Sequence, residues 1–99
     1  MAGLALADLA RQFGTPTFLY DAAAILRRLG DLAEFDYVRY AQKACSNLAI
    51  LDLLRRQGVL VDAVSAGEIR RALAAGYSAG GTPPPLVFTA DIFDAEALD

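Results

Sequence analysis

The spacing of apolar residues along this chain alternates between a helical period and the short continuous runs that are typical of buried strands. This alternation predicts helices and strands in turn, rather than a helical bundle or a β-sandwich. A first short helix is predicted to end at Phe13, before Gly14, and residues 15–20 are predicted to be extended. Asp21 is predicted to cap a second helix over residues 22–32.

A more regular cycle of strands and helices begins near residue 37. Three segments have the composition of strands, residues 37–44, 59–64 and 86–90. Helices are predicted between them over residues 46–58 and 65–76, and a third is expected to begin at Asp94. The inward-facing residues of the second of these helices are predicted to be Ile69, Ala72 and Leu73. One helix between successive strands, with right-handed crossovers, predicts a parallel sheet.

Two α/β architectures have a parallel sheet of this kind. An open doubly wound sheet carries a glycine-rich turn after its first strand, but residues 44–47 here read Ala-Cys-Ser-Asn. We therefore predict a partial (β/α)8 TIM-like barrel with about its first three β/α units over residues 37–99, after a lead-in over residues 1–36. Because a complete barrel takes about 250 residues, we expect the chain to be the N-terminal part of a longer protein.

Composition and charge exclude several classes of function. Apolar residues make up 56% of the chain, above the roughly 45–50% usual for soluble domains, which suggests surfaces that pack on other parts. A net charge of −3 without a basic cluster argues against nucleic acid as a partner. The chain has one cysteine and no histidine, so we predict no internal disulfide, no metal site and no histidine-dependent nucleophile.

The first ten residues resemble neither a signal peptide nor a membrane span. No positive charge precedes their apolar residues, and Asp8 interrupts the apolar run. We therefore expect a cytoplasmic protein with no membrane partner.

Lys43 occupies a position from which it could carry chemistry. Side-chain alternation within residues 37–44 places Arg39, Ala41 and Lys43 on one face, with Lys43 at the end of the strand, where barrel active sites lie. The small Ala41 leaves room for a flat ring, and a neutral lysine amine can form a Schiff base with an aldehyde. Spacing alone favours a lysine that is simply solvated at the end of a strand.

The residues around Lys43 favour a functional lysine over one that is simply solvated. YAQKACSN, residues 40–47, resembles the cofactor-lysine motif Y-A-x-K-A-N of the fold-type III pyridoxal-phosphate-dependent decarboxylases, whose barrel is of the alanine racemase type. Residues 14–21 are similar to the family's G-T-P…Y-D entry, and residues 61–68 to its D-V-x-S-x-G-E segment. The match continues through residues 87–89 and so covers essentially the whole chain.

The resemblance implies pyridoxal 5'-phosphate as cofactor, an amino acid as substrate and a homodimer in the full-length protein. The pattern is most similar to the branch that decarboxylates meso-2,6-diaminopimelate to L-lysine and CO2 in lysine biosynthesis. Alternatives are an ornithine- or arginine-type decarboxylase, a non-catalytic pyridoxal-phosphate-binding barrel and an α/β interaction module. Alanine racemases are disfavoured because no tyrosine-glycine-histidine-glycine stretch follows Lys43.

The same resemblance makes Lys43 the catalytic residue that binds the cofactor as a Schiff base. Asp62 lies in an aliphatic run, where a carboxylate is costly without a partner. If Leu60, Asp62 and Val64 face inward, Asp62 would adjoin Lys43 and have a catalytic and cofactor-binding role; otherwise it bonds to backbone near the end of the strand.

Three further residues near this site receive separate interpretations. Glu68 is a candidate cofactor-binding residue, although a capping box with Ser65 explains it equally well. Cys45 departs from the asparagine of the family motif and is expected to pack as a small apolar residue. Gln42 falls on the helix-facing side with Tyr40, which no rule of sequence explains.

Overall fold

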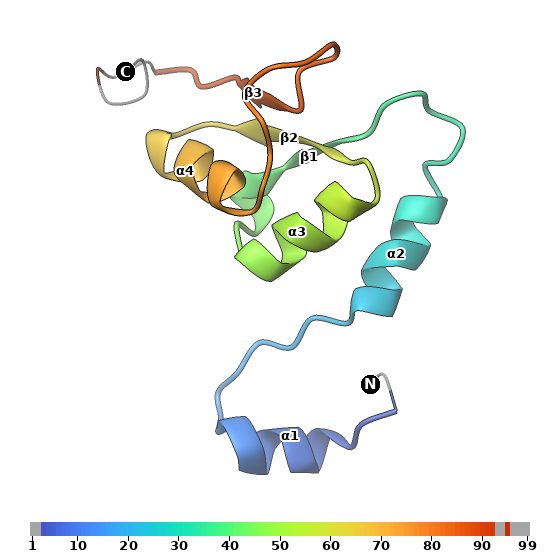
Figure 1. Cartoon of the computed structure of the whole chain (residues 1–99). Coiled ribbons are helices and arrows are strands. Elements are labelled where there is room, and N and C mark those ends of the chain that lie inside the picture. Colours follow the sequence, from blue (N-terminus) through green and yellow to red (C-terminus); the bar gives the residue numbers. More distant parts are fainter. Residues whose placement is uncertain (1–2, 93–94, 96–99) are drawn as a thin grey trace. The chain divides into compact units, whose positions relative to one another are not determined.

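The chain forms two compact units, residues 1–34 and residues 35–99. A computed structural model describes residues 3–92 and residue 95, which Figure 1 colours along the sequence. The predicted third helix, from Asp94, lies outside the described residues. None of the described helices is long and apolar enough to cross a membrane.

The first unit contains two helices, α1 (Leu6–Phe13) and α2 (Ala22–Gly30). Gly14 ends α1 as predicted, with a φ of 81° that glycine adopts without steric cost. Asp21 caps α2 as predicted, since its carboxylate accepts hydrogen bonds from two backbone N–H groups of the first turn. Residues 15–20 have no regular secondary structure, and α2 ends two residues before the predicted end at residue 32.

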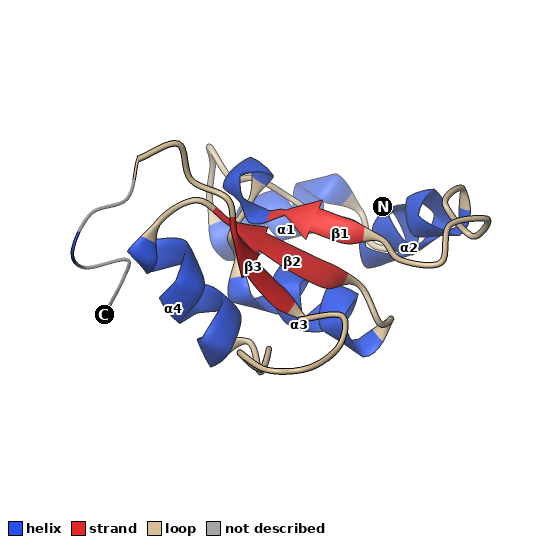
Figure 2. Ribbon diagram, turned by 90° about the horizontal axis from the view of Figure 1, so that it is seen from above, coloured by secondary structure: helices blue, strands red, loops and turns tan. Residues whose placement is uncertain are grey.

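The second unit is built on a parallel sheet in the order β1-β2-β3, as predicted. Its strands are β1 (Arg39–Ala41), β2 (Leu60–Ala63) and β3 (Leu86–Phe88), each shorter than predicted. Figure 2 shows the three strands side by side. In their register, Asp62 on β2 lies between Ala41 on β1 and Val87 on β3.

The prediction of a single strand over residues 37–44 was wrong. The strand ends at Ala41, and a short 3-10 helix, η1 (Gln42–Ala44), follows it. The chain has to turn here because the next helix begins within a few residues, and the Tyr40 hydroxyl donates a hydrogen bond to the Cys45 carbonyl across the turn (2.9 Å). Side-chain alternation along a strand therefore does not extend to Lys43.

Two helices, α3 (Leu48–Arg56) and α4 (Ala66–Ala74), cover one face of the sheet (Figure 1). Val61 and Ala63 of β2 point toward them and are fully buried. The core that joins sheet and helices consists of Leu51, Val61, Ala72, Ala75 and Tyr77, with Tyr40 and Leu86 packed against it. Full burial of one aliphatic side chain contributes about 1.5–3 kcal/mol. This apolar layer therefore holds the second unit together.

The buried face of α4 differs in one residue from the prediction. Ala72 is fully buried, but Leu73 is 46% exposed. Ala72 lies in the core, Ile69 is half-buried, and Leu73 is turned about 100° away from Ala72 around the helix axis. The small side chain of Ala72 lets α4 pack closely on the sheet.

Gln42 is fully buried in this second unit. Neither its amide nitrogen nor its amide oxygen has a hydrogen-bond partner among the described residues. A buried polar group without a partner costs about 1–3 kcal/mol. Gln42 therefore weakens the packing of η1 unless the amide gains a partner from elsewhere.

Replacing Gln42 by Met, which has a similar shape and no amide, is expected to raise the free energy of unfolding by about 1–3 kcal/mol. Urea denaturation of the protein measures this change. The control is Gln57→Met, because Gln57 is exposed at the end of α3. A loss of stability in Gln42→Met alone would show that the amide is hydrogen-bonded.

The buried Tyr77 hydroxyl makes stability depend on alkaline pH. It donates to the Val59 carbonyl (3.1 Å), and burial raises the pKa of Tyr77 from 10.0 to about 12. The unfolded chain therefore loses this proton first, and the stabilisation, complete below pH 10, is lost as pH rises to about 12. Tyr77→Phe should reduce the fall in unfolding free energy between these pH values.

Denaturant titrations at pH 9, 10 and 11 test this dependence. Tyr37→Phe is the matched control, because Tyr37 is 66% exposed. An equal fall in the wild type and in Tyr77→Phe would contradict the assignment to Tyr77.

Candidate active site at the carboxyl edge of the sheet

Lys43 lies in η1, directly beyond the carboxyl end of β1. Its side chain is exposed, and no hydrogen bond or ion pair joins its amine to another described residue. The amine is therefore available to react with a group placed at this edge of the sheet. The expected place at the edge is correct, although the residue belongs to a helical turn and not to the strand.

Asp62 is the third residue of β2 and is half-buried. Because Val61 and Ala63 face the helices, Leu60 and Asp62 face the other way, as predicted, while Val64 lies beyond the strand. The carboxylate does not bond to backbone. Its Oδ1 accepts a hydrogen bond from the Thr89 hydroxyl, which lies just beyond β3 (2.6 Å).

Lys43 and Asp62 lie at the same edge of the sheet without forming an ion pair among the described residues. Ala41 is the partner of Asp62 in the register, and Lys43 follows Ala41 by two residues. The expected contact between amine and carboxylate is therefore absent from this structure. The fold does bring their two chain segments together.

Glu68 lies in the first turn of α4 and takes part in two hydrogen bonds there. Its Oε2 accepts a hydrogen bond from the Val64 N–H (2.8 Å), and its own N–H donates to the Ser65 hydroxyl (3.2 Å). A capping box has the same reciprocal pattern, with the side chain here returning one residue further back. Glu68 thus has a structural role at the start of α4.

Arg39, which side-chain alternation also places on this face, has a structural role that the sequence did not predict. Its guanidinium donates to the carbonyls of Val61 (3.0 Å), Pro84 (3.0 Å) and Pro85 (3.4 Å). These bonds tie β1 to β2 and to the segment that leads into β3. A charged residue in a short apolar strand was the available signal, but its acceptors lie 22 to 46 residues away.

Tyr40 and Cys45 support the turn that carries Lys43. Tyr40 packs against the helix-facing core, as predicted, and burial raises the pKa of its hydroxyl. That hydroxyl donates to the Cys45 carbonyl, and the Cys45 side chain is half-buried. Both residues therefore stabilise the backbone between β1 and α3.

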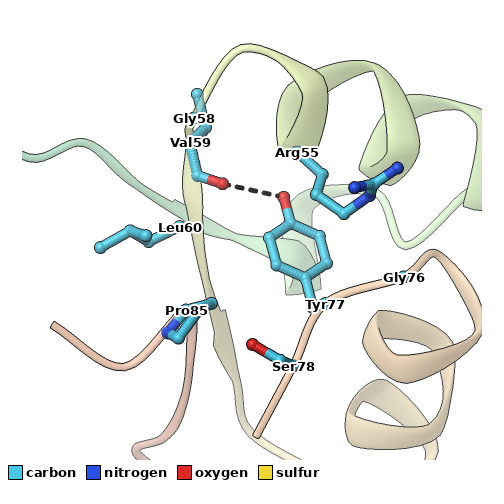
Figure 3. Close-up of a pocket in the computed structure, with 8 residues that line it drawn as sticks. All are labelled: Arg55, Gly58, Val59, Leu60, Gly76, Tyr77, Ser78 and Pro85. Atoms are coloured by element: carbon cyan, nitrogen blue, oxygen red, sulfur yellow. Dashed lines mark hydrogen bonds between the residues drawn. The ribbon is translucent and has the colours of Figure 1, made fainter. Parts of the chain in front are cut away.

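A cavity of about 280 Å³ lies at the opposite end of the strands (Figure 3). It is lined by Arg55, Gly58, Val59, Leu60, Gly76, Tyr77, Ser78 and Pro85. The Arg55 guanidinium is already engaged, since it donates to the Ala75 carbonyl (2.9 Å) and to Asp52 (2.8 Å). No amine or carboxylate of the predicted site reaches this cavity, which therefore adds nothing to that site.

The arrangement at the carboxyl edge suits carbonyl chemistry. An exposed primary amine can condense with an aldehyde, and a nearby carboxylate stabilises a positive charge that forms at the condensed nitrogen. Among the described residues, no group of three or more Cys, Asp or Glu side chains could hold a metal ion.

Comparisons with known proteins agree with this chemistry. Residues 23–99 match the family model for the pyridoxal-binding domain of pyridoxal-dependent decarboxylases. The chain is 58% identical over 96 residues to a diaminopimelate decarboxylase of Streptomyces coelicolor, and 54% identical over 94 residues to that of Escherichia coli K12. These alignments cover 97% and 95% of the chain but only 22% of each relative.

The fold is also similar to a solved structure. A crystal structure of diaminopimelate decarboxylase superimposes with a TM-score of 0.89 and 55% sequence identity, over 94% of this chain and 22% of that one. The chain thus spans about a fifth of the length of the relatives it matches. By its family match, it belongs to the pyridoxal-dependent decarboxylases, and residues 23–99 correspond to their pyridoxal-binding domain.

Proposed function

We propose that this chain is the N-terminal part of a pyridoxal-phosphate-dependent enzyme that decarboxylates meso-2,6-diaminopimelate to L-lysine and CO2. The observation that carries this proposal is an exposed amine, Lys43, at the same edge of the sheet as the Asp62 carboxylate. The names of the similar proteins supply the substrate. The enzyme would act in the cytoplasm as a homodimer.

The sheet would be the start of a (β/α)8 barrel, with three of its β/α units in residues 37–99. Successive strands are neighbours, all three are parallel, and α3 and α4 lie on one face. The other face carries Arg39, Asp62 and Val87 and is covered by no helix of residues 35–92. Helices on the outer face of a parallel sheet, with reactive groups at the carboxyl ends of its strands, are typical of a barrel.

Lys43 would hold pyridoxal 5'-phosphate covalently. The residues present fit this group: the amine is exposed, the adjoining strand position is the small Ala41, and a carboxylate lies on the next strand. When bound, the cofactor accepts the electrons that decarboxylation leaves on the substrate carbon. The chain's own contribution is to orient the amine and to keep a negative charge beside it.

Asp62 would be the catalytic and cofactor-binding partner of Lys43. Its position between Ala41 and Val87 places it in the middle of the sheet, within one strand of the Lys43 segment. A carboxylate there favours a protonated nitrogen at Lys43. Glu68 would support the cofactor site through α4, whose first turn it holds against Val64.

Lys43→Ala in the full-length protein should abolish the absorbance band of lysine-bound cofactor and lower kcat at least about a thousandfold, because no other group supplies the covalent link. Borohydride reduction of the full-length protein followed by peptide mass spectrometry should place the label on the peptide that contains Lys43, which is the one lysine of residues 1–99. Arg27→Ala, which removes an exposed cation from α2, is the control. An unchanged band in Lys43→Ala would refute the assignment.

The 99-residue chain by itself should release no CO2 from diaminopimelate, since no helix of residues 35–92 covers the face of the sheet that carries Asp62 and excludes water from it. Carbon dioxide release, compared with the full-length enzyme at equal concentration, measures this. Assay of the full-length enzyme with diaminopimelate, ornithine and arginine identifies the substrate. Preference for ornithine or arginine would overturn the proposed substrate and leave the cofactor site unaffected.

A further inference from the structure

Thr89 extends the sheet one residue beyond β3. Its N–H donates to the Ala63 carbonyl (3.0 Å), so the backbone ladder continues past Phe88. Because Asp62 lies opposite Val87 and side chains alternate, Thr89 shares a face with Asp62. The Thr89 hydroxyl donates to Asp62 Oδ1 at 2.6 Å.

The geometry of this bond restricts the carboxylate. A distance of 2.6 Å falls in the range of charge-assisted O–H···O bonds, and an ionised carboxylate only accepts, so the threonine proton is committed to Oδ1. Threonine is β-branched and its backbone is held by Ala63, which limits the directions its hydroxyl can take. Asp62 is left with Oδ2 for a second partner.

The residue of β1 directly opposite Asp62 carries no polar side-chain group. This residue is Ala41, and its side chain is a single methyl group. Lys43 follows two residues later at the same edge. Asp62 therefore lies between a hydrogen-bond donor on the β3 side and the amine-bearing turn on the β1 side.

We propose that Thr89 is a positioning residue that orients the Asp62 carboxylate toward Lys43. This inference rests on the proposed function, in which Lys43 binds the cofactor and Asp62 stabilises the positive charge at that nitrogen. In this proposal Thr89 acts through Asp62, to which its hydroxyl donates. The hydroxyl, and not the bulk of the side chain, carries the effect.

The experiment compares Thr89→Val with Thr89→Ser in the full-length enzyme. Thr89→Val keeps the shape but removes the donor, so kcat should fall about tenfold while KM changes less than about threefold, as expected for misplacement of a catalytic group. Capture of added pyridoxal phosphate, followed as growth of the lysine-bound band, should slow about tenfold. Thr89→Ser should restore both rates to within about threefold of wild type.

Thr82→Val is the matched control, because Thr82 is an exposed threonine in the loop before β3. Its rates should equal those of the wild type. If Thr89→Val does not fold, Thr89→Ala carries the same test, since it also removes the hydroxyl. A serine variant as slow as the valine variant, or a valine variant as fast as wild type, would overturn the proposal.

A double-mutant cycle separates action through Asp62 from a general effect on the sheet. In an Asp62→Ala background, Thr89→Val should change the rate of cofactor capture less than about twofold. A full tenfold effect in both backgrounds would assign Thr89 a structural role and overturn the inference.

The two proposals fail in distinguishable ways. If Lys43→Ala retains the lysine-bound band, the proposed function is wrong, whatever the Thr89 variants do. If Lys43→Ala loses the band but Thr89→Val captures cofactor at the wild-type rate, only the role of Thr89 is wrong.

Discussion

Burial of one side of β2 is the constraint on which the rest of the second unit depends. Val61 and Ala63 are fully buried against α3 and α4. Since successive side chains of a strand point to opposite faces, this burial directs Leu60 and Asp62 to the other side. A shift of one residue would expose the aliphatic pair and bury the carboxylate, at a cost of several kcal/mol. The position of Asp62 is thus a consequence of core packing.

The two ends of the sheet carry different sets of polar groups. At the amino end, Arg39 of β1 donates to carbonyl groups of β2 and of the segment that leads into β3, and the buried Tyr77 hydroxyl donates to the Val59 carbonyl. At the carboxyl end lie Lys43, Asp62 and Thr89. The amino end keeps the strands in register, so the groups at the carboxyl end stay in fixed relation to one another. The carboxyl end, where the candidate site lies, is the usual place of chemistry in parallel α/β folds.

Much of the fold could be predicted because the signals are local. Gly14 and Asp21 bound the helices of the first unit, and Ser65 with Glu68 forms the predicted cap of α4. The parallel sheet followed from the order of strands and helices. The course of the chain after Ala41 could not be predicted in this way, because the turn is stabilised by a hydrogen bond from Tyr40 to a carbonyl five residues on. The local pattern there favoured a longer strand.

The sequence by itself determined the family, the cofactor-lysine candidate and the alternation that turns Asp62 away from the helices, since each depends on neighbouring residues or on a contiguous string. Only the tertiary structure determined which side chains and carbonyl groups contact one another. Thr89 binds Asp62 from 27 residues away, Arg39 reaches carbonyls on two other segments, and Gln42 becomes fully enclosed. Such contacts arise when separate strands pair and helices pack on them, and the spacing of residues along the chain does not specify which side chains then meet.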